Sequence, residues 1–230
     1  FGHWRGLDRL GQQNVALPGC DPALWLQLVA PLSSDPQAIL DAFRRMAVCD
    51  PLRMRPMVHS VGILVWLGRI DEAVDMARQS LSMADHPSLS RHLALGLALR
   101  GDTNEAVAMA NSVIREEDEL LRVRAMLSAV RGDAAAAKRY QVDFLGKYGP
   151  NDRETLIMEA AQGNRGEANR LAAAIDARPF GHVVLMQAIY DCLCGAPFDL
   201  GAAPEFAGLL VESGLDWPPP RPGAFPLKDW

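Results

Sequence analysis

Three arginines stand at equal intervals in the middle of the chain and offer the clearest chemistry in the sequence. The interval from Arg91 to Arg122 is the same as that from Arg122 to Arg153. A guanidinium group donates paired hydrogen bonds in one plane, a geometry that matches carboxylate groups. A row of such groups predicts a surface that binds an acidic or carboxylate-bearing peptide.

Apolar residues follow these arginines four positions later: Leu95, Met126 and Ile157. Four residues are about one helical turn, so we expect these side chains to lie beside the arginines as the floor of one groove. A local alternative stays open for Arg122. Asp118 and Glu119 precede it by four and three residues, a spacing at which ion pairs form within one helix.

The other reactive residue types show no recognisable catalytic or metal-binding pattern. Motifs of phosphate-binding loops, dinucleotide-binding turns, zinc proteases and serine hydrolases are missing from the sequence. The five histidines, which have no metal-ligand spacing, are His3, His59, His86, His92 and His182. We therefore expect no enzyme activity, no cofactor and no bound metal.

Composition indicates an all-α fold. The chain has 230 residues and is rich in alanine and leucine, the best helix formers, with only two threonines. Its net charge of -5 disfavours nucleic-acid binding, and no apolar run is long enough to span a membrane. We expect a cytoplasmic protein, with small buried thiols at Cys20, Cys49, Cys192 and Cys194.

A short sequence motif, called the phrase below, recurs along the chain and predicts the helices that carry the arginines. It is centred on Gly68, Gly101, Gly132 and Gly163, and an alanine follows each glycine by five residues. Glycine tolerates the positive φ at which a helix ends, and Asp102, Asp133 or Asn164 can cap the next helix. The small alanine suits a close helix crossing. Each phrase therefore predicts a tight turn between two antiparallel helices.

The phrase and its spacing resemble the tetratricopeptide repeat (TPR) family. The resemblance covers roughly residues 20–213 and includes Asp50-Pro51, which matches the Asp-Pro between repeats of that family. The chain departs from the family in its central repeat period, which is slightly shorter than usual. The large aromatic near the start of the first helix is also missing, with Met57, Ser90 and Leu121 at those places. The resemblance implies a right-handed α-solenoid whose first helices line a concave groove.

The predicted organisation is one helical repeat domain over residues 1–215 and a proline-rich tail over 216–230. The units are expected at about 20–50, 51–84, 87–116, 118–147, 149–177 and 181–213. The end of the chain, from Cys194 onward, loosely resembles the ends of TPR regions in larger bacterial signalling proteins. The chain begins at Phe1 without a methionine, and we expect it to be a piece of such a protein.

The tail carries Trp217, Phe225 and Trp230 and a run of prolines. We expect it to fold back as an ordered cap on the last unit, whose apolar face would otherwise be exposed. Two alternatives stay open. The tail could enter the groove as a self-ligand, with Asp229 near the arginines, or remain free for a proline-binding partner.

Two functions from different classes are consistent with these features. The first is a non-catalytic protein-interaction or regulatory scaffold module that binds a peptide or neighbouring domain in its groove. The second is a small-molecule sensing domain that controls an attached cyclase or DNA-binding domain. An enclosed pocket with convergent polar groups would favour the sensor, and an open groove the scaffold.

Overall fold

The computed structural model describes residues 36–51, 53–113, 117–192 and 196–213, together with Gly6, Arg9, Leu10 and Gln13. Over these residues it contains helices and no strand, which confirms the all-α prediction. The helices are α3 (Pro36–Cys49), α4 (Met54–Trp66), α5 (Ile70–Met83), α6 (Pro87–Arg100), α7 (Thr103–Val113), α8 (Glu117–Val130), α9 (Ala134–Tyr148), α10 (Asp152–Ala161), α11 (Arg165–Asp176), α12 (Gly181–Cys192), the 3₁₀ turn η2 (Leu200–Ala202) and α13 (Pro204–Ser213).

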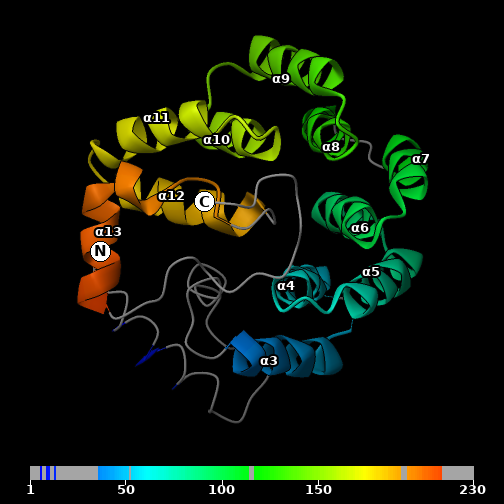
Figure 1. Ribbon diagram of the computed structural model, residues 1–230. Helices are drawn as coiled ribbons and strands as arrows, with labels where there is room; N and C mark the ends of the chain where they lie inside the picture. The colour runs from blue at the N-terminus through cyan, green and yellow to red at the C-terminus, as the bar shows by residue number, and fades with distance from the viewer. Residues whose placement is uncertain are drawn as a thin grey trace.

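The helices follow one another around an open arc in two layers (Figure 1). Helices α4, α6, α8, α10 and α12 form an inner row in which each contacts the next member. Helices α5, α7, α9 and α11 lie outside this row (Figure 1). This arrangement explains why α6 is buried at every position from Leu89 to Ala98, because neighbours cover it on several sides.

The four phrase glycines adopt the backbone that the sequence predicts. Gly68, Gly101, Gly132 and Gly163 have φ of 75°, 98°, 76° and 80°. At Gly101 the glycine N–H donates to the carbonyl of Ala98 (3.1 Å), and the next N–H donates to that of Leu97 (2.9 Å). The other three glycines repeat this pair of bonds, which defines the Schellman helix stop. The same local sequence feature therefore produces each of the four turns.

The alanines after these glycines lie at the helix crossings. Ala106 and Ala168 are fully buried, as predicted, and Ala73 and Ala137 are equally inaccessible. They belong to one apolar core that runs continuously from α3 to α13. A larger side chain at any of these places would force the two helices apart.

The predicted helix caps are partly realised. Asp133 accepts a hydrogen bond from the Ala136 N–H (2.9 Å), as expected of a cap. The expectation for Asn164 is wrong, because its side chain makes no cap bond. Its amide donates instead to the carboxylate of Glu159 (2.6 Å), which lies buried at the end of α10. This bond fixes the orientation of the Asn164 side chain, and its carbonyl oxygen accepts no backbone N–H of α11.

A distant carboxylate fixes the last helix. Both oxygens of Asp176, at the end of α11, accept backbone N–H groups at the start of α13, from Glu205 (2.8 Å) and Phe206 (2.9 Å). Phe206 packs edge-on against Phe198, with ring centroids 6.0 Å apart. Helix α13 is thus docked on the arc by a buried cap and an aromatic pair.

The second helix of the opening unit, predicted over about 20–50, is confirmed as α3. Several expectations lie outside the described residues: the first half of that unit, before residue 36, the tail over 216–230 and the side chains of Cys20, Cys192 and Cys194. Cys49 is described, and the expectation of a buried thiol there is wrong. It is exposed at the end of α3 and disulfide-bonded. Among the helices described above, none has the length and apolar character needed to cross a membrane.

Candidate functional site

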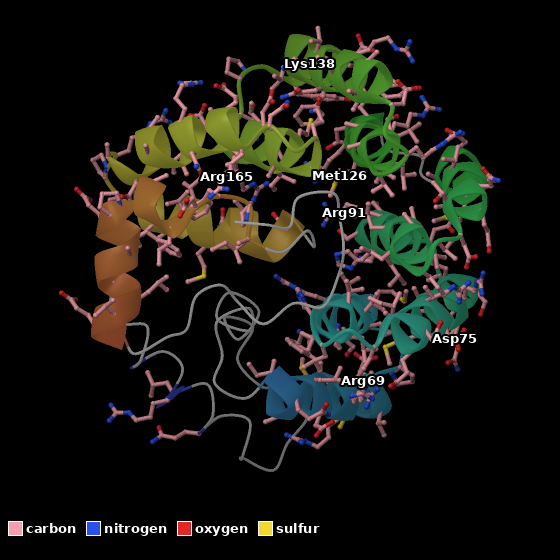
Figure 2. All side chains as sticks on the ribbon, viewed as in Figure 1. Arg69, Asp75, Arg91, Met126, Lys138 and Arg165 are labelled. Atoms are coloured by element: carbon pink, nitrogen blue, oxygen red, sulfur yellow. The ribbon has the colours of Figure 1, made fainter. Side chains whose placement is uncertain are left out.

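The three equally spaced arginines lie on alternate helices of the chain. Arg91 is on α6, Arg122 on α8 and Arg153 on α10, which are consecutive members of the inner row. Figure 2 shows Arg91 on the inner side of the arc, whereas Asp75 and Lys138 lie on its outer side. The side chains are largely buried: Arg91 is 7% exposed as a residue, and the side chains of Arg122 and Arg153 are 12% and 28% exposed.

Two of these arginines share one buried carboxylate. Glu154 is inaccessible to solvent, and its two oxygens meet Arg122 Nε at 2.8 Å and an Arg153 terminal nitrogen at 2.7 Å. Arg153 also pairs with Asp191 on α12 (3.2 Å). These pairs join α8, α10 and α12. Arg122 and Arg153 are therefore engaged in ion pairs with carboxylates on α10 and α12.

The apolar residues expected beside the arginines belong to the core. Leu95, Met126 and Ile157 are 0%, 1% and 1% exposed and pack within the continuous apolar cluster. They expose almost no surface to a ligand. These three side chains therefore do not form the floor of an open groove.

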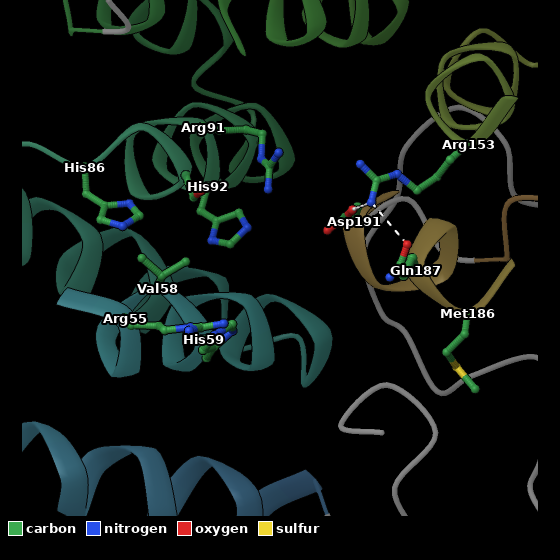
Figure 3. A pocket seen from close by; sticks show the side chains of 11 residues that line it. Arg55, Val58, His59, His86, Arg91, His92, Arg153, Met186, Gln187 and Asp191 are labelled. Atoms are coloured by element: carbon green, nitrogen blue, oxygen red, sulfur yellow. Dashed lines mark hydrogen bonds and ion pairs between the residues drawn. The ribbon is translucent and has the colours of Figure 1, made fainter. Parts of the chain in front are cut away.

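A cavity of about 450 Å³ opens on the inner side of the arc. Its described lining comes from two walls that face each other (Figure 3). Helices α4 and α6 make one wall, and α10 and α12 make the other. The lining residues are Arg55, Val58, His59, His86, Ser88, Arg91, His92, Arg153, Met186, Gln187 and Asp191.

Guanidinium groups outnumber carboxylates in the described lining of this cavity, although the chain as a whole is acidic. Among its described lining residues, three carry a guanidinium group (Arg55, Arg91, Arg153) and one carries a carboxylate (Asp191). Asp191 is paired with Arg153 on the α10/α12 wall. Arg55 and Arg91 lie on the opposite wall, formed by α4 and α6.

Two histidines of the α4/α6 wall are held neutral. Burial lowers the pKa of His59 to about 4, with smaller contributions from the charges of Arg55 and His86. Burial also lowers the pKa of His92 well below its usual range, helped by Arg91. His92 is 4% exposed, and a ring N–H donates to the backbone carbonyl of Val58. Its Nδ1 is buried without a hydrogen-bond partner.

One feature of the sequence, the spacing of two histidines, could have indicated this cavity. The interval from His59 to His92 equals the interval from Gly68 to Gly101. The two histidines therefore occupy the same register position in successive hairpins. No comparable spacing indicates Arg55, and only the curvature of the arc brings it opposite Arg153.

The described residues contain no cluster of three or more histidine, cysteine or acidic side chains arranged to hold a metal ion. No family model, no curated protein and no solved structure matches the chain.

Proposed function

We propose that this chain is a non-catalytic protein-interaction module, built as a right-handed solenoid of TPR-like hairpins, that binds a partner on its concave face. The TPR-like interpretation is supported by four turns with the same helix stop and the same buried alanine. A concave binding face is supported by the continuous inner row of helices (Figure 1). In such modules the repeated inner helices supply one extended surface to a partner.

The observation that carries this proposal is the basic cavity on the inner side of the arc. It favours a peptide or neighbouring domain with acidic groups, because guanidinium groups pair with carboxylates. Arg55 and Arg91 line the cavity on the α4/α6 wall, and we expect acidic side chains of the partner to meet these two guanidinium groups. The net charge of the chain argues against nucleic acid as the partner.

Selection from a random peptide library tests the proposal. Peptides of about 12 residues, long enough to cross several helices of the row, are selected on the immobilised protein. The selected peptides are then synthesised, and their affinity is measured for the wild type and for Arg91→Ser. The matched control is Arg170→Ser on the outer helix α11, where the arginine is exposed and pairs with Glu167.

The proposal predicts enriched acidic peptides that lose roughly tenfold or more in affinity with Arg91→Ser and bind Arg170→Ser like the wild type. Peptides that depend on the outer arginine and ignore Arg91 would refute the concave face. Failure to select any peptide would refute peptide recognition by this chain. The sensing alternative is supported by a different observation, the cavity volume of about 450 Å³, which lies in the range of small-molecule sites.

A further inference from the structure

We propose that a second, smaller pocket, lined by residues of α7, α8 and α9, binds a phosphate monoester group. It is called the outer pocket, because α7 and α9 belong to the outer layer of helices (Figure 1). This site goes beyond the proposed peptide surface, since it uses other helices and recognises a single anionic group. Its support comes from the shape of the pocket, the state of its arginines and the number of donors that they offer.

One face of α8 forms the middle of the outer pocket. Arg124, Leu127 and Ser128 lie three and four residues apart, and Arg131 follows close to one turn later, so they share a side of the helix. The pocket has a volume of about 220 Å³, below the roughly 300–1,000 Å³ of sites that enclose whole drug-sized ligands. It therefore suits one charged group with a short attachment. The described lining is Val107, Ala110, Asn111, Arg124, Leu127, Ser128, Arg131 and Tyr140.

The arginines of the outer pocket are not paired with carboxylates. Its described lining contains two guanidinium groups, Arg124 and Arg131, and no carboxylate. Over the described part of the chain, Arg131 makes no ion pair, and the Arg124 guanidinium contacts an amide and an aromatic ring. The acidic residue nearest to Arg131 in the sequence, Asp133, accepts a backbone N–H at the start of α9. Both positive charges are therefore open to an anion.

Arg124 is oriented before any ligand binds. Its Nε and one terminal nitrogen donate to Oδ1 of Asn111 at 3.0 and 2.7 Å, and its guanidinium carbon lies 5.8 Å from the ring centroid of Tyr140. The amide oxygen is neutral, so it positions the group without cancelling its charge. These two bonds use two of the five N–H groups of the guanidinium and leave three for a ligand. The guanidinium carbon of Arg139 lies 5.0 Å from the same ring centroid and adds a third positive charge beside the pocket.

These donors match a phosphate monoester better than a carboxylate. A phosphate monoester carries three acceptor oxygens and about 1.5–2 negative charges at neutral pH, whereas a carboxylate has two oxygens and one charge. Arg124 and Arg131 supply two positive charges, and the Ser128 hydroxyl is a further donor. Val107 and Leu127 offer apolar contacts to the carbon that carries the ester oxygen. A free metabolite and a phosphorylated side chain present this same group.

Isothermal titration of the full chain at neutral pH with four probes tests the proposal and distinguishes the two sources. Glycerol 3-phosphate represents a free metabolite, and a five-residue phosphoserine peptide represents a modified protein. Acetate and the unphosphorylated peptide are their controls. At least one phosphate probe should bind with a Kd of about 1 mM or tighter, and at least about tenfold more tightly than acetate and the unphosphorylated peptide. Binding of glycerol 3-phosphate alone assigns the site to a metabolite, and binding of the peptide alone assigns it to a phosphorylated partner.

Variants assign the binding to the outer pocket. Arg131→Ser changes an exposed side chain and should weaken the phosphate probes roughly tenfold, whereas Arg170→Ser, at an exposed arginine of α11 that pairs with Glu167, should not. Asn111→Ala keeps both positive charges and releases Arg124, so it should weaken binding by a smaller factor, roughly threefold.

Three results would overturn the assignment: no binding of either phosphate probe at about 10 mM, acetate binding as tightly as the phosphate probes, or unchanged affinity in Arg131→Ser. Selection of peptides on the inner row depends on Arg91 and is measured separately. Either proposal can therefore fail alone.

Discussion

Acidification from pH 7 to pH 5 should destabilise the fold through His59. This histidine is buried on α4, and its pKa falls from 6.5 to about 4 on folding. The folded state therefore resists the proton that the unfolded chain accepts. Because the folded pKa is the lower one, stability is unaffected well above pH 6.5, falls as the pH drops below it, and reaches its full loss below about pH 4.

The size of the effect follows from the two pKa values. With 6.5 in the unfolded chain and about 4 in the fold, the free energy of unfolding should fall by about 2 kcal/mol between pH 7 and pH 5. Between pH 8 and pH 7 the same relation gives only about 0.1 kcal/mol. His92 acts in the same direction, since its pKa is also lowered, so the wild type should lose more than His59 alone accounts for.

Urea unfolding followed by circular dichroism at pH 8, 7 and 5 measures this loss. Carboxylates also titrate near pH 5, so the comparison needs a variant. His59→Phe keeps a ring against Phe43, whose centroid lies 5.1 Å from that of His59, and removes the titration. Its loss between pH 7 and pH 5 should be smaller than that of the wild type by about 2 kcal/mol. Equal losses in the two proteins would refute the reasoning.

Four further perturbations test the packing, the disulfide and the tail. Ala106→Leu should cost roughly 1–3 kcal/mol in urea unfolding, because the alanine is fully buried where two helices cross; an unchanged midpoint would contradict this. Asp176→Ala should cost about 1–2 kcal/mol and speed amide exchange at the start of α13, whose cap it removes. Cys49 should react with iodoacetamide only after reduction, as peptide mass mapping would show. Truncation after Gly214 should lower the melting temperature if the tail caps the last unit, and an unchanged value would reject that cap.

The turns were predictable because their causes are local. A helix stop at Gly101 needs only the glycine and the carbonyls of the preceding turn, and the sequence repeats this arrangement at four places. The burial of Ala106 follows from the same register. The cap at Asn164 failed because Glu159, five residues earlier, binds its amide, and this carboxylate is itself held by Lys138 and Gln141 of α9.

The partners of the arginines were beyond the sequence pattern. Glu154 belongs to the hairpin after that of Arg122, and only the packing of α8 against α10 brings the two side chains to 2.8 Å. The cavity has the same origin, because its walls meet through the accumulated curvature of the whole row. The spacing of residues in the sequence predicts which of them share a register position, but it does not predict the curvature of the row.

The proposed role of the concave face is tested most directly by locating a selected peptide on the protein. A nitroxide label on the peptide broadens the nitrogen-15 amide resonances of the residues near it. The amides of the inner helices α6 and α8 should broaden, while those around Arg170 on the outer helix α11 should keep their width. Broadening confined to the outer helices would contradict binding on the concave face.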